Sequence, residues 1–177
     1  VEGGTLDAHA RRPGVGLADR LELMARVADA VQAAHTRGII HRDLKPGNIL
    51  VASGEAGDSV GQPKVLDFGV ARLTNADLMV TSLKTEASQL IGTLQYMSPE
   101  QLGSDSGAVD ARSDVYALGV IAYEIVSGRR AFDLGGLAIG EAASKPQSGR
   151  AAPLRSRDAA LPRDAEVIAA KATAPDA

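Results

Sequence analysis

The sequence of 177 residues contains no cysteine and no tryptophan, and only 3% of its residues are aromatic. The lack of cysteine excludes disulfide bonds and thiolate-bound metals, so any metal must have oxygen or imidazole ligands. The net charge of only -3 gives no reason to expect nucleic acid as a partner. These properties predict one globular domain in a reducing, cytoplasmic environment.

Long hydrophobic runs are also absent. The most apolar stretch, residues 115–126, is interrupted by Glu124 and is shorter than the ~20 residues that a bilayer requires. This stretch predicts a buried helix, and the chain is expected to have no membrane segment. The start, Val1-Glu2-Gly3-Gly4, lacks a methionine, a basic region and an apolar signal core, so it is not a targeting peptide. We expect the chain to begin in the middle of a domain.

Helical periodicity is clearest in three segments. Residues 17–36 predict an amphipathic helix that stops near Gly38, with apolar side chains at Leu17, Leu21, Met24, Ala28, Val31 and Ala34. Residues 114–127 predict a helix at the centre of the domain, with Ser113 as its N-cap and Gly128 as its end. Residues 162–173 predict one last helix.

Short apolar runs predict strands around polar loops. Ile39-Ile40 and Ile49-Leu50-Val51 bracket a polar loop at 41–48, and Lys64-Val65-Leu66 fits the returning strand of a hairpin. Residues 53–62 predict a solvated turn, and residues 67–100 a long irregular segment. The Gly, Ser, Pro, Ala and Arg bias of residues 135–163 predicts weak order there.

Several motifs together resemble the protein kinase family. His41-Arg42-Asp43-Leu44-Lys45-Pro46-Gly47-Asn48 and Asp67-Phe68-Gly69 resemble its catalytic loop and metal-binding motif. Gly92-Thr93 and Ser98-Pro99-Glu100 resemble the end of its activation segment, and Asp114-Val115-Tyr116 with Gly119 resembles the start of its central helix. Val1-Glu2-Gly3-Gly4-Thr5-Leu6 resembles the hinge between the two kinase lobes. About ten specified positions in family order make coincidence negligible.

The resemblance implies a mainly α fold with a small β-hairpin, the α+β C-terminal lobe of a serine/threonine kinase of the bacterial type. Residues 1–134 would run from the hinge through the central helix, and residues 135–177 would form an abbreviated, partly flexible end of the same lobe. The family's Gly-rich loop and strand lysine would precede Val1, so the small lobe is missing. We expect the missing N-terminal lobe to be a required partner and the fragment alone to be inactive.

Transfer of the terminal phosphoryl group of ATP to a protein Ser or Thr hydroxyl needs charge neutralisation more than covalent help. The resemblance implies that Asp43 aligns the hydroxyl, that Lys45 binds the phosphate and that Thr93 bridges the two. It assigns Mg²⁺ to the oxygen ligands Asn48 and Asp67. The cofactor site for ATP would be formed by Val1, Thr5, Lys45, Asn48, Leu50 and Asp67.

The resemblance also implies regulation and structural support. Arg42 beside the aspartate is typical of kinases controlled by phosphorylation of the activation loop, because arginine pairs well with phosphate. The candidate phosphosites are Thr81, Ser82, Thr85 and Ser88. His41 and Phe68 are interpreted as packing residues, and Asp114 as a helix N-terminal acid that also braces the catalytic-loop backbone. His9 and His35 are interpreted as surface or packing residues rather than ligands.

Two alternatives stay open. One is a pseudokinase-like regulatory or binding module that uses the fold as a docking surface, against which the intact Asp43, Asn48 and Asp67 count. The other is a gene remnant or misassembled fragment. The arginine that pairs with the glutamate of the Ser-Pro-Glu motif in the family would lie beyond Ala177, so Glu100 is expected to lack that partner.

Overall fold

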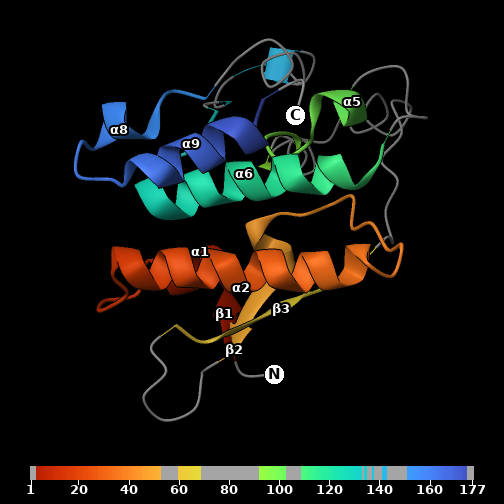
Figure 1. The fold of residues 1–177 in the computed structure, drawn as a ribbon, viewed down its shortest axis with the longest axis horizontal. Coiled ribbons are helices and arrows are strands. Elements are labelled where there is room, and N and C mark those ends of the chain that lie inside the picture. Colours follow the sequence, from red (N-terminus) through yellow and green to blue (C-terminus); the bar gives the residue numbers. More distant parts are fainter. Residues whose placement is uncertain are drawn as a thin grey trace.

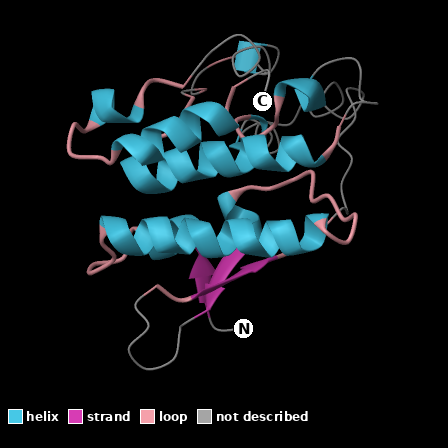
Figure 2. Cartoon of the chain, viewed as in Figure 1, coloured by secondary structure: helices cyan, strands magenta, loops and turns pink. Residues whose placement is uncertain are grey.

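A computed structural model of the chain describes residues 3–52, 60–68, 92–102, 109–132, 134, 137, 141–142 and 151–174. Helices dominate these ranges, and one small sheet lies at one end of the molecule (Figure 2). The elements follow one another as β1 (Gly3–Thr5), α1 (Leu6–Ala10), α2 (Leu17–His35), the 3-10 helix η1 (Pro46–Asn48), β2 (Ile49–Ala52), β3 (Gln62–Val65), α5 (Pro99–Leu102), α6 (Ala111–Ser127), α8 (Leu154–Arg157) and α9 (Arg163–Ala172).

The helix α2 forms the middle layer of the structure. It packs against β3 on one side and against α6 on the other, and α9 covers α6 (Figure 1). The buried face of α2 consists of Leu23, Met24, Val27 and Val31, spaced by one, three and four residues as on one side of a helix. The prediction of this helix is confirmed, but Ala28 is exposed and does not belong to the buried face.

The sheet has three antiparallel strands in the order β1-β2-β3. The predicted hairpin is confirmed, with Ile49 paired to Val65, although β3 begins at Gln62 rather than Lys64. The predicted strand at Ile39-Ile40 is wrong. The Ile39 amide donates to the Ala34 carbonyl at 3.1 Å and so completes the end of α2, and the Ile39 side chain is 44% exposed. The strand that completes the sheet is β1, and its sequence shows no alternation of apolar and polar residues that would have predicted it.

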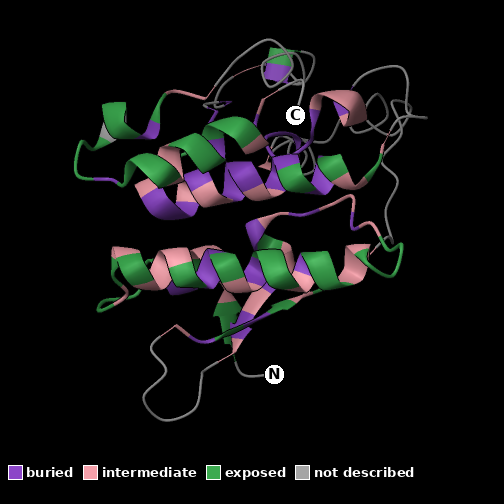
Figure 3. Cartoon of the chain, in the orientation of Figure 1, coloured by how far each residue is buried: buried purple, intermediate pink, exposed green. Residues whose placement is uncertain are grey.

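The helix α6 supplies the largest part of the core. Ten of its residues are buried, in agreement with its expected central position (Figure 3). It begins three residues earlier than predicted, because Asp110 is the N-cap and accepts from the Arg112 amide at 2.7 Å. Ser113 is therefore not the cap and lies within the helix. Gly128 ends the helix in the left-handed conformation, with φ 68°, as predicted.

The C-terminal part of the chain packs on α6 through α8 and α9. The helix predicted at 162–173 is confirmed as α9. Gly119 of α6 allows this close packing, because a Cβ atom there would lie 2.6 Å from the Ala172 Cβ. No helix in the described ranges is both long and apolar enough to span a bilayer.

Candidate active site

The polar loop at 41–48 joins the end of α2 to β2 and is held from inside the protein. His41 is 1% exposed, and its Nε2 lies 2.7 Å from the Leu66 carbonyl oxygen. The His41 ring also packs on Phe68, with ring centroids 4.9 Å apart. The predicted packing of these two side chains is confirmed, so the loop is anchored to the segment that follows β3.

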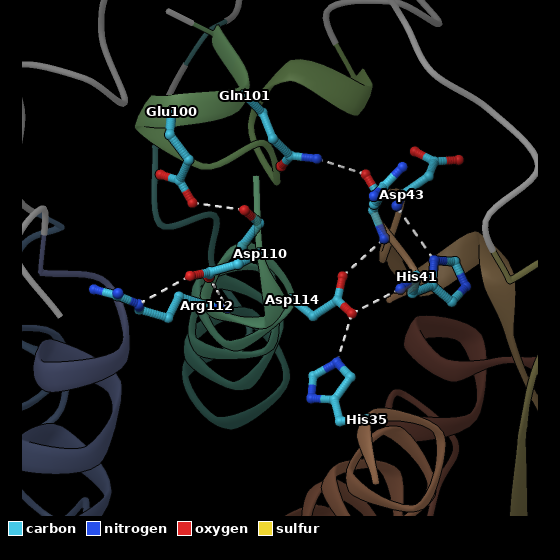
Figure 4. A network of polar contacts seen from close by, with 10 residues as sticks. His35, His41, Asp43, Glu100, Gln101, Asp110, Arg112 and Asp114 are labelled. Atoms are coloured by element: carbon cyan, nitrogen blue, oxygen red, sulfur yellow. Dashed lines mark hydrogen bonds and ion pairs between the residues drawn. The ribbon is translucent and has the colours of Figure 1, made fainter. Parts of the chain in front are cut away.

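Asp114 fixes the backbone at the start of this loop. Its side chain is 1% exposed, and its Oδ2 and Oδ1 accept from the His41 and Arg42 amides, each at 2.8 Å. His35 Nε2 lies 2.7 Å from the same Oδ2 (Figure 4). The bracing expected of Asp114 is therefore confirmed. Hydrogen bonds to a buried carboxylate are stronger than neutral ones, which makes this a rigid joint between the loop, α2 and α6.

Arg42 has a strained backbone that is held from both sides. Its φ of 69° is in the left-handed region, which costs a residue with a Cβ ~1–2 kcal/mol. Asp114 binds its amide, and Gln101 Nε2 donates to its carbonyl oxygen at 2.7 Å (Figure 4). Gln101 Oε1 in turn accepts from the Ser98 amide at 3.0 Å. The backbone of Arg42, which directly precedes Asp43, is therefore held by hydrogen bonds at both its amide and its carbonyl.

Sequence reasoning missed the roles of His35 and Gln101. Their partners lie 79 and 59 residues away along the chain, so no local pattern could have identified either of them. The interpretation of His35 as a packing residue holds, and the structure adds that it packs between α2 and α6 as a hydrogen-bond partner of Asp114. Glu100 also has a partner, because it accepts a hydrogen bond from the Ser113 hydroxyl at 2.6 Å. The helical position of Ser113 thus serves a contact between α6 and α5.

Asp43, Lys45, Asn48 and Thr93 form one polar cluster. Lys45 Nζ lies 3.0 Å from Asp43 Oδ2 and donates to the Thr93 hydroxyl at 3.4 Å. Asn48 Nδ2 donates to Asp43 Oδ2 at 3.0 Å and to the Asp43 carbonyl oxygen at 2.8 Å. The side chains of Asp43 and Lys45 are 22% and 29% exposed, so solutes can reach them. The sequence-predicted residues of this cluster are brought together.

Asp67 lies just after β3, the second strand of the hairpin, on the side of Asn48. The Leu66 amide donates to the Asn48 carbonyl oxygen at 2.8 Å, so the next residue emerges beside Asn48. Asp67 is exposed, and its φ of 57° is in the left-handed region that Asp tolerates better than most residues. Within the described ranges its carboxylate makes no hydrogen bond or ion pair, which leaves its oxygens available to a ligand.

The side-chain oxygen atoms of Asn48 and Asp67 are suitable ligands for a magnesium ion. Both described bonds of the Asn48 side chain use Nδ2, so its Oδ1 remains for a cation, and Asp67 adds a carboxylate. The described residues contain no cluster of three or more His, Cys, Asp or Glu side chains that could enclose a metal. Magnesium suits such an open set, because it usually keeps several waters and binds through one or two protein ligands plus phosphate oxygens.

The residues predicted to border a nucleotide lie at one end of the sheet. Thr5 on β1 is paired with Leu50 on β2, and both side chains are partly buried. The Thr5 hydroxyl donates to Asp7 Oδ1 at 2.7 Å. Val1 lies outside the described residues, as do Gly69 and the candidate phosphosites Thr81, Ser82, Thr85 and Ser88.

Comparison of the sequence with known proteins identifies the family of this chain. The protein kinase domain model matches residues 1–148. The chain is 47% identical over 118 residues to the serine/threonine-protein kinase Pkn1 of Myxococcus xanthus, and 40% identical over 134 residues to the serine/threonine-protein kinase PknA of Mycobacterium tuberculosis. These matches cover 67% and 75% of this chain but only 16% and 28% of the two relatives.

A third relative, the probable serine/threonine-protein kinase PknB of Corynebacterium glutamicum, is 45% identical over 111 residues, which is 63% of this chain and 16% of that protein. The chain thus matches only a small part of each of these three proteins. The family match nevertheless extends over most of the 177 residues and includes all the clustered polar side chains. The chain belongs to the protein kinase domain family and groups with its bacterial serine/threonine kinases.

Proposed function

We propose that residues 1–177 are the C-terminal lobe of an ATP-dependent serine/threonine protein kinase. The observation that carries the proposal is the cluster of Asp43, Lys45 and Asn48 beside Asp67, on a loop that Asp114 holds in place. The small antiparallel sheet and the central helix α6 support the assignment to a lobe. Residues 1–134 would carry the site, and the packing of α9 on α6 supports including residues 135–177 in the same lobe.

Asp43 would act on the hydroxyl that receives the phosphoryl group. Its partly exposed carboxylate would accept the hydrogen bond of a Ser or Thr hydroxyl and orient the oxygen in line with the terminal phosphorus of ATP. As the new O–P bond forms and the bond to ADP breaks, the hydroxyl proton would pass to Asp43. Asn48 and Lys45, both bonded to Asp43, would keep that carboxylate in one orientation.

The remaining residues of the site would handle negative charge. Lys45 would bind the phosphoryl group in transfer, and Thr93 would hold the Lys45 ammonium from its other side. Asn48 Oδ1 and Asp67 would hold Mg²⁺, which when bound would neutralise the charge of the phosphates. Val1, Thr5 and Leu50 would border the nucleotide. The second half of the nucleotide site would come from a small lobe outside residues 1–177, and the cytoplasm, as the site of ATP, would be the place of action.

Arg42 is proposed to respond to phosphorylation. Its buried Nε makes no hydrogen bond with a described residue, so a phosphate that reached Arg42 would satisfy an unpaired buried donor. A phosphate on Thr81, Ser82, Thr85 or Ser88 would be the ligand. Removal of Arg42 would then abolish activation by phosphorylation while leaving the Asp43 cluster in place.

The decisive experiment compares Asp43→Asn with the unchanged full-length gene product that carries residues 1–177. Labelled phosphate from ATP and Mg²⁺ is offered to a library of Ser-, Thr- and Tyr-containing peptides. We expect Asp43→Asn to lower the rate by ~10²–10⁴, the range of a positioned acid–base group. The label should appear on Ser and Thr. Asp29→Asn, on the exposed side of α2, is the matched control and should keep the full rate.

Two outcomes would contradict the proposal. An unchanged rate in Asp43→Asn would remove Asp43 from the mechanism, and transfer by the purified 177-residue chain alone would show that no further lobe is needed. A folded full-length protein that transfers no phosphate to any peptide would instead favour the pseudokinase-like module. Circular dichroism of each variant checks that the fold is retained.

A further inference from the structure

An open groove of about 500 Å³ begins at the candidate active site and is not explained by phosphoryl transfer. Lys45 and Thr93 line its inner end, and Lys45 is the residue that touches Asp43. From there the groove runs past Tyr96 toward the end of α6. A polypeptide whose hydroxyl lies at Asp43 would therefore place neighbouring side chains in this groove. Among the described residues that line it, six are charged, namely Asp7, Arg11, Lys45, Glu124, Arg129 and Arg130.

The two acids of the lining are already engaged. Asp7 accepts from the Thr5 hydroxyl at 2.7 Å and lies 3.6 Å from Arg11. Glu124 Oε2 accepts from the Tyr96 hydroxyl at 2.7 Å. Burial raises the pKa of Glu124, and the nearby charges of Arg130 and Arg11 oppose this rise only in part. The groove therefore contains little unused negative charge.

The cations of the lining are in a different situation. Lys45 is paired with Asp43, and Arg11 is loosely paired with Asp7. Arg129 and Arg130 follow the glycine that ends α6, and both are exposed. Their guanidinium groups make no hydrogen bond or ion pair within the described ranges. Two adjacent arginines without a salt bridge, of which only Arg130 lies near Glu124, leave the described lining with more cations than acids.

A cationic side chain would bind here less well than an anionic one. Of the two described acids in the lining, Glu124 has one oxygen without a hydrogen bond, and Arg11 and Arg130 both lie close enough to Glu124 to lower its pKa. A substrate arginine or lysine that reached Glu124 would meet the repulsion of these two guanidinium groups. A carboxylate or phosphate would meet no such repulsion, and arginine binds both with paired hydrogen bonds.

We propose that this groove selects protein substrates with an anionic side chain near the accepting Ser or Thr, and that Arg129 and Arg130 bind that side chain. The inference rests on the proposed kinase function, since it assigns the groove to the substrate of the same site. The ligand chemistry is a carboxylate or a phosphate monoester carried by the substrate polypeptide. Lys45 marks the boundary between the acceptor position and this specificity site.

Peptide binding to the 177-residue chain tests the proposal without any phosphoryl transfer. Peptides with one central Ser carry a pair of Glu residues placed at successive positions on either side, and matched peptides carry Gln, Lys or phosphoserine instead. Binding is followed by NMR of isotope-labelled protein. We expect Glu peptides to shift the Arg129 and Arg130 signals and to bind at least tenfold more tightly than the Lys peptides. Arg129→Glu with Arg130→Glu should weaken Glu-peptide binding about tenfold.

The matched control is the double variant Arg37→Glu with Arg112→Glu. It changes the net charge equally, but both residues are exposed, and Arg112 lies at the opposite end of α6 from Arg129. This variant should keep its affinity within about twofold. The comparison of Glu peptides with phosphoserine peptides identifies the anion that is bound. Tighter binding of either peptide than of the Gln and Lys peptides supports the proposed specificity site.

Three results would overturn the proposal: Gln or Lys peptides that bind as tightly as Glu peptides, shifts confined to residues outside the groove, or an equal loss of binding in the control variant. These results are separable from failure of the kinase function. If Asp43→Asn abolishes transfer while acidic and basic peptides are phosphorylated equally by the full-length protein, the function stands and only the specificity site is lost.

Discussion

The helix α6 carries two acids in contrasting environments, one near each end. Asp114 near its start is 1% exposed and has three hydrogen-bond partners, from α2 and the 41–48 loop. Glu124 near its end has the Tyr96 hydroxyl as a partner, and its buried Oε1 has no well-aligned hydrogen bond, although the Ala131 amide is near enough to lower its pKa. The first acid is fully bonded and the second is not.

If the groove binds substrate as proposed, one helix serves both stability and recognition. A fully bonded buried carboxylate fixes its partners and has no capacity left for a ligand. This suits Asp114, which must hold the loop that presents Asp43. An incompletely bonded acid at the edge of a groove leaves the local charge balance to neighbouring arginines, which suits a surface that meets substrates. The following predictions test this contrast along α6.

The largest effect is expected from Asp114→Ala. The variant leaves the His41 and Arg42 amides without their acceptor and frees the strained Arg42 backbone. Loss of one partner from a buried charged network costs ~3–5 kcal/mol, which urea unfolding followed by circular dichroism would measure. Asp110→Ala, which removes only the exposed N-cap of the same helix, should cost ~1 kcal/mol. Equal losses in the two variants would mean that Asp114 is not a brace.

An intermediate effect is expected from Gly119→Ala, between the two acids. The new methyl group would lie 2.6 Å from the Ala172 Cβ and 3.0 Å from the Thr173 Cγ2, so α9 would have to move. Overpacking of this kind costs ~1–3 kcal/mol, which should exceed the gain of ~1 kcal/mol from the better helix propensity of Ala. Thermal unfolding checks the sign. Gly47→Ala, where a Cβ meets no atom within 4 Å, is the control. A stabilised Gly119→Ala would show that α9 does not pack as described.

The smallest effect is expected from Glu124→Gln, and it should depend on pH. Because burial raises the pKa of Glu124 above its ordinary value of 4.5, the folded state holds the proton more tightly than the unfolded state. The wild-type protein should therefore lose stability as the pH rises from 4.5 through the folded pKa, and the Gln variant should not. One pKa unit corresponds to about 1.4 kcal/mol, and we expect the relative gain of the variant to be of this size or less.

Urea unfolding of both proteins across pH 4 to 8 would measure this gain. Glu22→Gln changes an exposed carboxylate on α2 and should show a difference of only a few tenths of a kcal/mol over the same range. A Glu124→Gln variant whose relative stability falls with rising pH would contradict the assigned sign. That result would place Glu124 among the well-paired acids and would remove the contrast with Asp114.

The motifs predicted the polar cluster well because its chemistry depends on residue type and short spacing. Asp43, Lys45 and Asn48 lie within six residues of one loop, and this short separation keeps their side chains close to one another. The same reasoning failed at Ile39-Ile40, where two β-branched residues suggested a strand. The Ile39 amide is bonded to the Ala34 carbonyl at the end of α2 and so cannot join the sheet. Competition between elements for backbone hydrogen bonds is invisible in a local pattern.

The amino-acid sequence by itself determined the family, the helices α2, α6 and α9 and the residues of the polar cluster, because periodicity and motif spacing act over a few neighbouring residues. Only the tertiary structure decided that His35 and Gln101 help Asp114 to hold the loop, and that Arg129 and Arg130 share a groove with Lys45. These contacts join residues dozens of positions apart. Their formation depends on how helices pack around a common core, and the free energy of that packing is a property of the whole chain.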